Sequence, residues 1–338
     1  MVLDTGQFTD WLRAVPLREP DMSAPLVVVL AQGTARDTEL SAAPELPAII
    51  VALDPRGALP TGWAQQADVL LTTAPGAPAP WVAVPPAAWD ATLDAIALCV
   101  AGSPLASVAL VQVLRAGVGS GFAQALLLES FAYSTLLGGV EFARWRTSRR
   151  ARPDRAGTDG SVRSERSADT MYLTFARAAR RNALSAHMRH ALAGALQLAV
   201  ADASIAHVVL RGEGPCFCAG GDLDEFGMAS DGASAHLIRL AQSACRWMEP
   251  IRRKVSVHVH GACVGAGIEI AACAGRVVAD AGCVFRLPEL GMGLVPGAGG
   301  TASITRRIGR HRTAFMALTG TDVLAPVAWQ WGLVDAID

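Results

Sequence analysis

The stretch HGACVGAGIEIAACAG, from His260 to Gly275, decides the fold because it changes from strand-like to helix-like pattern within a few residues. It overlaps the alternating run VSVHVHG (Val255–Gly261), which predicts a strand, and ends in an apolar segment, Ala266–Ala274, which predicts a short helix. Glycines between them allow a tight turn whose backbone N–H groups face a ligand. Glu269 falls in the first turn of the helix, where it is either a catalytic carboxylate or one that stabilises the helix dipole.

Two further glycine-rich turns lie on either side of this stretch. GEGPCFCAGGDLDEFG (Gly212–Gly227) follows a β-branched run, and FRLPELGMGLVPGAGGT (Phe285–Thr301) places Glu289 after another apolar strand. Two carboxylates in apolar, glycine-lined surroundings suit general acid/base chemistry, because desolvation raises a carboxyl pKa towards neutrality. Cys216 and Cys218 form a Cys-x-Cys without a second ligand pair, so we expect buried thiols and no metal.

Strand and helix patterns alternate through this half of the chain. Met171–Arg177, His207–Gly212 and Arg276–Asp280 read as strands, whereas Ser185–Val200 reads as a helix with Ser185 as its N-cap. The alternation predicts an α/β fold with parallel strands.

The first half of the chain repeats this order in a weaker form. LVVVLAQG (Leu26–Gly33), PAIIVALDPRG (Pro47–Gly57) and ADVLLTTAPG (Ala67–Gly76) are followed by WVAVP and by helical sequence from Ala87 to about Ala143. The three segments match, in order, VVLRGEGP, VSVHVHGACVG and GRVVADAG of the second half. Two interpretations stay open: a degenerate, structural copy of the second half, or the chance similarity of any two α/β segments.

Composition divides the chain into three units and narrows the class of protein. We expect an N-terminal α/β region over 1–145, an Arg/Ser/Gly-rich linker over 146–169 and a catalytic core over 170–338. Lys plus Arg (29) nearly equals Asp plus Glu (30), so no global charge attracts nucleic acid or an anionic membrane. The linker arginines could bind RNA, but no aromatic platform beyond Trp145 accompanies them, which favours a solvated tether.

The cysteines and apolar segments predict the compartment. The 7 cysteines show no disulfide framework, and no secretory leader is recognisable, so we expect a cytoplasmic protein without disulfides. Ala95–Leu114 has the length of a membrane span, but Gly102, Ser103 and Pro104 interrupt it. Two shorter buried helices in a soluble protein are therefore expected there.

The three turns resemble motifs of the enoyl-CoA hydratase/isomerase (crotonase) family. FCAGGDLDEF (Phe217–Phe226) and GACVGAGIEIA (Gly261–Ala271) are similar to its two oxyanion motifs, and FRLPELGMGLVPGAGGT is similar to its second acidic stretch. RRNALS (Arg180–Ser185) is similar to the loop that lines the CoA adenine site. The resemblance runs from Met171 to Asp338 and implies a crotonase-like spiral of ββα repeats acting on CoA thioesters, without metal or redox cofactor.

The resemblance also implies roles for individual residues. Glu269 and Glu289 match both acidic positions of hydratases, and the backbone N–H groups of Ala219 and Ala266 match the oxyanion hole. The expected substrate- and CoA-binding residues are Arg181, Ala183, Gly220, Gly221, Asp222 and Gly267. Which glutamate holds the proton stays open.

The implied activity is an enoyl-CoA hydratase, a lyase of fatty acid metabolism and β-oxidation that adds water across the α,β double bond. The alternatives are an isomerase or C–C hydrolase or lyase on the same fold, or a non-catalytic acyl-CoA-binding subunit. Pocket walls are expected from Leu223–Ala244 and Leu290–Leu294, but the sequence does not identify the acyl group of the substrate. Family members suggest a homo-oligomer, either a trimer or a hexamer.

The resemblance departs from the family at the C-terminus. The sequence ends at LVDAID, where family members continue with helices that cover the site. Ser103–Trp145, which contains a Leu-x-x-Glu-Ser-x-x-Tyr pattern, resembles those helices. We therefore expect a rearranged chain in which helices of the first half pack on the catalytic half.

Overall fold

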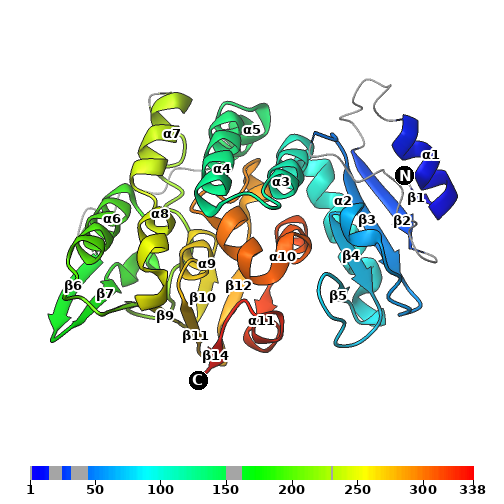
Figure 1. The fold of residues 1–338 in the computed structure, drawn as a ribbon. Helices are drawn as coiled ribbons and strands as arrows, with labels where there is room; N and C mark the ends of the chain where they lie inside the picture. Colours follow the sequence, from blue (N-terminus) through cyan, green and yellow to red (C-terminus); the bar gives the residue numbers. More distant parts are fainter. Residues whose placement is uncertain (1, 15–24, 32–44, 150–161, 230) are drawn as a thin grey trace.

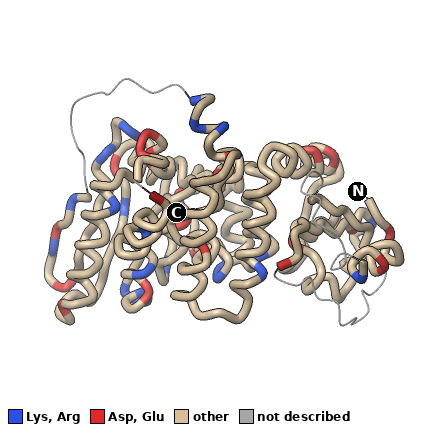
Figure 2. The backbone as a smooth tube through the Cα atoms, turned by 90° about the horizontal axis from the view of Figure 1, so that it is seen from above, with Lys and Arg blue, Asp and Glu red and all other residues tan. Residues whose placement is uncertain are grey.

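A computed structural model describes residues 2–14, 25–31, 45–149, 162–229 and 231–338. Two α/β units lie side by side with helices between them, and Figure 1 shows the N-terminal sheet at one end of the molecule. Lys and Arg are interspersed with Asp and Glu at both ends (Figure 2), as expected from the balanced composition.

The N-terminal unit is a parallel sheet whose strands follow the order of the sequence. Its strands are β1 (Val2–Leu3), β2 (Leu26–Leu30), β3 (Ile49–Asp54), β4 (Val69–Thr72) and β5 (Val82–Ala83). Ile50 on one face of β3 belongs to a cluster with Phe8 of α1 (Thr5–Ala14), and Val51 on the other face packs with the following helices. Both faces are covered, which explains why the central strands are continuous apolar runs.

Helices follow this sheet and continue to the predicted linker. They are α2 (Trp89–Gly102), α3 (Pro104–Ala116), α4 (Phe122–Leu137) and α5 (Val140–Ser148). The break expected inside Ala95–Leu114 is confirmed, because Ser103 separates α2 from α3.

None of the helices in the described ranges is by itself long and apolar enough to cross a membrane. Pro86–Gly102 and Pro104–Ala116 satisfy the length and composition only together, and they meet at a bend of 107°.

The second unit carries a six-stranded and a three-stranded sheet. The large sheet has the order β14-β11-β9-β8-β7-β6 and consists of β14 (Ala336–Ile337), β11 (Arg276–Ala279), β9 (Val255–Val259), β8 (His207–Gly212), β7 (Thr170–Phe175) and β6 (Val162–Ser167). The small sheet consists of β10 (Ala262–Val264), β12 (Val284–Arg286) and β13 (Val323–Leu324). Pairing is parallel except for β6 with β7 and β13 with β12.

The helices of this unit complete a spiral of repeated strand–strand–helix turns. They are α6 (Ala186–Ala201), α7 (Gly232–Ala241), α8 (Ala244–Met248), α9 (Ala266–Ala271), α10 (Gly300–Thr319) and α11 (Ala325–Trp331). One turn of the spiral is β9, β10 and α9, and the next is β11, β12 and α10. Short 3-10 turns are η2 (Trp63–Gln65), η3 (Pro86–Ala88), η4 (Ala178–Arg180), η5 (Glu249–Lys254) and η6 (Glu289–Met292). The Ser185 hydroxyl caps α6 by accepting from the Met188 N–H, as predicted.

The proposed repeat between the halves is not shown by the fold. Both large sheets add parallel strands largely in chain order, but the described part of the first half has no counterpart of the small sheet. The predicted linker also needs correction, because Val162–Ser167 form β6 and Arg146–Ser148 belong to α5. The β6 strand pairs along its length with β7, and sequence periodicity missed it because five of its six residues are exposed. The rest of the linker's centre, 150–161, lies outside the described residues.

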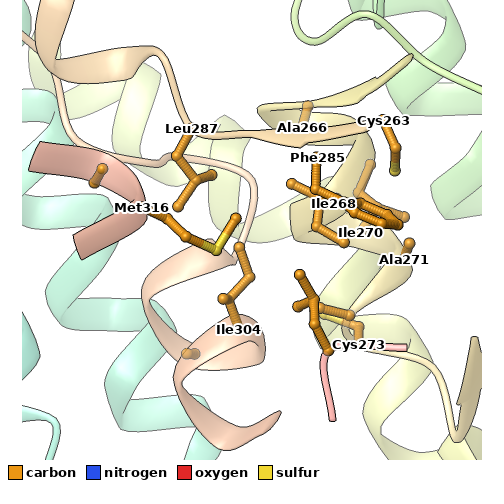
Figure 3. Close-up of a cluster of buried hydrophobic side chains, with 14 of the residues drawn as sticks. Cys263, Ala266, Ile268, Ile270, Ala271, Cys273, Phe285, Leu287, Ile304 and Met316 are labelled. Atoms are coloured by element: carbon orange, nitrogen blue, oxygen red, sulfur yellow. The ribbon is translucent and has the colours of Figure 1, made fainter. Parts of the chain in front are cut away.

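The core of the catalytic unit is built around α9. Figure 3 shows Ile268 and Ile270 of this helix beside Phe285 of β12, with Ile304 and Met316 of α10 nearby. Burial of α9 on all sides explains why its sequence is apolar apart from Glu269.

The expectation that the chain has no disulfide is contradicted, because Cys245 of α8 and Cys273 after α9 are joined as a disulfide. They are 28 residues apart, and the fold alone brings their Cα atoms to 5.5 Å. Cys216 and Cys218 are free and buried, as expected.

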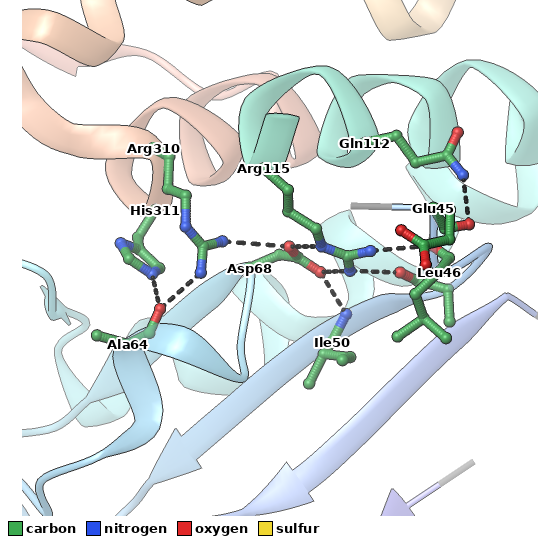
Figure 4. A network of polar contacts seen from close by, with 10 residues as sticks. Glu45, Leu46, Ile50, Ala64, Asp68, Gln112, Arg115, Arg310 and His311 are labelled. Atoms are coloured by element: carbon green, nitrogen blue, oxygen red, sulfur yellow. Dashed lines mark hydrogen bonds and ion pairs between the residues drawn. The ribbon is translucent and has the colours of Figure 1, made fainter. Parts of the chain in front are cut away.

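The two units are fastened together by buried ion pairs (Figure 4). Asp68 accepts hydrogen bonds from Arg115 of α3 at 2.5 and 2.8 Å and from Arg310 of α10 at 3.3 Å. His311 lies 2.8 Å from the Ala64 carbonyl, which also accepts from Arg310. Arg310 and His311 of α10 thus hold the N-terminal sheet against the catalytic unit.

Candidate active site

The two predicted catalytic glutamates line one pocket of about 470 Å³. Glu269 lies in the first turn of α9, and Glu289 begins η6 directly after β12. Their exposures are 2% and 6%, so both carboxyls are nearly removed from bulk water. The adjacent β10 and β12 pair in parallel, which explains how residues 20 positions apart in sequence reach the same pocket.

Glu269 is fixed by the glycine-rich loop before α10. Its Oε2 accepts hydrogen bonds from the N–H groups of Ala298 at 2.7 Å and Gly300 at 2.9 Å. Burial raises the pKa of Glu269 to about 7, while these backbone bonds act in the opposite direction by favouring the carboxylate. The group is therefore able to exchange a proton near neutral pH.

Glu289 is held differently. Its Oε2 is buried and has no hydrogen-bond partner among the described residues. Burial and then the charge of Glu269 raise the pKa of Glu289 well above its ordinary value. Gly265 has φ +50°, and a Cβ there would lie 2.5 Å from Glu289 Oε1, so glycine is required beside the carboxyl.

The first and second glycine-rich turns run alongside one another. Cys218 and Cys263 form a parallel bridge, and the Cα of Gly220 lies 3.7 Å from where a Gly265 Cβ would be. A Cβ on Gly267 would approach the Cys218 carbonyl to 2.6 Å, so this close packing also depends on glycine. Ala266 lines the pocket as the first residue of α9, where a backbone N–H has no partner within the helix.

In the first glycine-rich turn, the Ala219 N–H that was predicted to face the ligand already has a partner. The Ala219 N–H donates to the Arg181 carbonyl at 3.0 Å, and Ala219 does not line the pocket. Leu184 bonds to Gly220 and Asp222 on either side of Gly221, so the N–H of Gly221 points away from Leu184. Gly221 lines the pocket together with Ala266.

The predicted CoA-binding residues are not all at the pocket. Gly221 and Asp222 line it, whereas Arg181, Ala183, Gly220 and Gly267 do not. The Asp222 carboxylate is engaged by Arg177 at 2.6 Å; despite its burial, this hydrogen bond and charge lower the pKa of Asp222. Arg181 adopts φ +52°, and its carbonyl accepts the Ala219 N–H. Their roles towards CoA stay predictions.

Helix α4 covers the pocket, as expected from the resemblance of Ser103–Trp145 to helices that cover the site in the family. It contributes a third buried carboxylate, Glu129, which the sequence analysis quoted within a motif but gave no role. Glu129 accepts from the N–H groups of Gly299 (2.7 Å) and Thr301 (2.8 Å) and from the Thr301 hydroxyl (2.7 Å). The backbone N–H groups of residues 298–301 thus donate alternately to the two carboxylates: those of Ala298 and Gly300 to Glu269, and those of Gly299 and Thr301 to Glu129.

Electrostatics link these carboxyls. Burial and then the charge of Glu269 raise the pKa of Glu129 to about 8, although the hydrogen bonds from Thr301 and Gly299 act in the opposite direction. Three buried carboxyls around one loop do not all ionise at neutral pH, because each charge disfavours the next.

The remaining walls come from both halves of the chain. Tyr133 and Leu126 of α4 face the pocket, together with Arg239 of α7 and Arg189 of α6. Residues 225–229, 235, 238–240 and 242–244 contribute, in partial agreement with the expected wall. Leu290–Leu294 do not line the pocket, whereas residues 297–299 do. The described residues include no cluster of three or more His, Cys, Asp or Glu side chains suited to a metal ion.

Comparisons with known proteins agree with this geometry. A model of the enoyl-CoA hydratase/isomerase family matches residues 165–338. The 2,3-dehydroadipyl-CoA hydratase of Escherichia coli K12 is 35% identical over 167 residues, which are 49% of this chain and 65% of that protein. The mevalonyl-coenzyme A hydratase SIDH of Beauveria bassiana is 37% identical over 145 residues, 40% of this chain and 52% of that protein.

Solved structures are similar to about half of the chain. An enoyl-CoA hydratase of Mycobacterium smegmatis is 28% identical, with a TM-score of 0.48 over 52% of this chain and 69% of that one. The chain thus spans less than two thirds of the length of the two curated relatives.

Proposed function

Because the chain belongs to the enoyl-CoA hydratase/isomerase family, we propose that it adds water across the α,β double bond of an enoyl-CoA thioester. The observation that carries the proposal is the pair Glu269 and Glu289, buried in one pocket with raised pKa values. Hydration needs one group that removes a proton from water and another that gives a proton to carbon. Two carboxyls in different environments can divide these tasks.

The thioester oxygen is proposed to lie between the N–H groups of Gly221 and Ala266. Both residues line the pocket, and Gly221 replaces Ala219 in this role because the Ala219 N–H is already bonded. Two fixed N–H donors would stabilise the negative charge that develops on the thioester oxygen as the enolate forms. The methyl group of Ala266 leaves its N–H available.

From their environments we propose different tasks for the two glutamates. Glu269 accepts two backbone hydrogen bonds, which favour its carboxylate and make it the base that removes a proton from water. Glu289 has an oxygen without any donor and the more strongly raised pKa, so it holds a proton. The water oxygen bonds to the β-carbon, and the Glu289 proton goes to the α-carbon. Proton transfer between the carboxyls or through solvent restores the resting state.

The test is loss of the conjugated-thioester absorbance when crotonyl-CoA or longer enoyl-CoAs are mixed with the protein. Wild type should consume the substrate, and Glu269→Gln and Glu289→Gln should each be slower by at least about 100-fold, the lower range for a general acid or base. Equal rates in wild type and both variants would rule out this mechanism. Binding of CoA thioesters without any turnover would favour the non-catalytic subunit.

A further inference from the structure

The pocket contains two arginines that the proposed hydration does not use. Arg189 of α6 and Arg239 of α7 line it together with apolar side chains and the glutamates. We propose that they bind a carboxylate carried by the acyl group, so that the substrate is an enoyl-CoA with an anionic acyl end. This inference rests on the proposed function, because it names the substrate class of the same pocket.

Arg239 is held by neutral groups alone. Its Nη1 donates to the hydroxyls of Ser130 (3.1 Å) and Ser134 (2.9 Å) and to the Ser130 carbonyl (3.3 Å), all on α4. The guanidinium carbon lies 4.2 Å from the centre of the Tyr133 ring. These contacts orient the cation without neutralising it, and burial lowers the pKa of Arg239. A half-buried guanidinium in this state favours an anionic ligand.

Arg189 of α6 also donates its hydrogen bond to a neutral group. Its Nε donates to the Gln242 side-chain carbonyl at 3.1 Å. Glu225 is its acidic neighbour, but that carboxylate accepts the Ala186 N–H at 2.6 Å and lies beyond ion-pair distance. Burial lowers the pKa of Arg189, which again shows incomplete compensation of its charge.

Three other arginines away from bulk water, Arg115, Arg177 and Arg307, each contact an aspartate, at 2.5, 2.6 and 3.1 Å. Among the described residues, the buried Arg312 bonds only to the backbone carbonyls of Ala77 and Trp81, but it does not line the pocket. In the described ranges, no ion pair includes Arg189 or Arg239. The charges of Glu129 and Glu269 act on Arg239 from a distance, but neither carboxylate forms an ion pair with it in the described ranges.

The arginines line the same pocket as the two glutamates. Tyr133, whose ring centre lies 4.2 Å from the Arg239 guanidinium carbon, also lines it. The acyl group, which must place its double bond between the glutamates, reaches this region. The planar guanidinium of an arginine can donate two parallel hydrogen bonds to a carboxylate. A pocket of about 470 Å³ limits the acyl chain to a modest length.

The experiment compares matched substrates. Each pair consists of trans-2-enoyl-CoAs of equal length that end in either a methyl group or a carboxylate, such as trans-2-hexenoyl-CoA and its six-carbon ω-carboxylate counterpart. Wild type should prefer the carboxylate member in kcat/KM by about 10- to 100-fold, the range of a charge-assisted hydrogen-bonded pair. Arg239→Met should remove most of this ratio, and Arg239→Lys should keep part of it. Arg253→Met, an exposed arginine outside the pocket, is the matched control and should keep the ratio.

Two results would overturn the inference. One is a wild type that prefers the methyl substrate or shows no preference. The other is an Arg239→Met variant that lowers kcat/KM equally for both members, which would point to CoA phosphates or to a structural role. Calorimetric binding of hexanoyl-CoA and of its saturated ω-carboxylate counterpart separates this inference from the hydration proposal. Preferential binding of the carboxylate without turnover would refute hydration and support the anion site, whereas equal binding would refute the anion site.

Discussion

Replacing Glu129 with alanine removes the acceptor that α4 supplies to the loop before α10. Two buried N–H groups and one hydroxyl lose their partner, and each such donor left unsatisfied costs about 1–3 kcal/mol. For the three donors together this cost is about 3–9 kcal/mol. The alanine variant no longer has to bury this carboxyl, a cost that raises the pKa of Glu129 to about 8 in wild type, and this offsets part of the loss. We therefore expect the unfolding free energy to fall by roughly 2–5 kcal/mol.

The same change should impair the reaction. Ala298 and Gly300, which hold Glu269, alternate along the loop with the residues that Glu129 holds. A displacement of about 1 Å at the catalytic carboxyl corresponds to a loss of roughly 100-fold in kcat. Because substrate binding depends on other walls, KM should change less than kcat. Glu129→Gln keeps one oxygen and the side-chain volume, so its effects should be smaller in both measurements.

Urea unfolding and steady-state kinetics on an enoyl-CoA test these expectations. Glu141→Ala is the matched control, because Glu141 is also buried and accepts the N–H groups of Leu105 and Ala106 at 2.8 and 3.0 Å, but caps α3 instead of the catalytic loop. It should lose stability with little change in kcat or its pH profile. If Glu129→Ala behaves in the same way, Glu129 is a structural cap and the link to Glu269 is refuted.

Three further predictions concern stability and backbone. Burial raises the pKa of Glu269 from 4.5 to about 7, so between these pH values the folded state retains a proton that the unfolded state releases. The unfolding free energy should therefore fall by on the order of 3 kcal/mol as the pH rises through this window. Urea unfolding at pH 5 and pH 8 measures this fall, which should be smaller in Glu269→Gln. Asp68→Asn leaves two buried arginines without an anion and should lower the unfolding free energy by about 3–5 kcal/mol; a change below 1 kcal/mol in urea would contradict this. Gly265→Ala should reduce turnover by at least about 100-fold, whereas Gly194→Ala, on an open helix surface, should leave turnover unchanged.

Sequence periodicity predicted much of the fold because strands and helices have different apolar spacing. Five strands of the catalytic half (β7, β8, β9, β11 and β12), the helix after Ser185 and the break at Ser103 were recognisable from local pattern, whereas the short β10, β13 and β14 were not predicted. β6 was missed, because an exposed edge strand carries no apolar period. The proposed repeat was not confirmed, since short α/β segments resemble one another whether or not they share an architecture.

By itself the sequence determined the family motifs and the pair Glu269 and Glu289, because glycine-rich turns and lone carboxylates in apolar segments are local features. Only the tertiary structure decided which groups surround them. Glu129 and Arg239 reach the pocket from distant helices, the N–H of Ala219 proved to be occupied, and Cys245 met Cys273. Such contacts depend on how the helices of one half pack on the loops of the other, and side-chain packing leaves no regular spacing in the sequence.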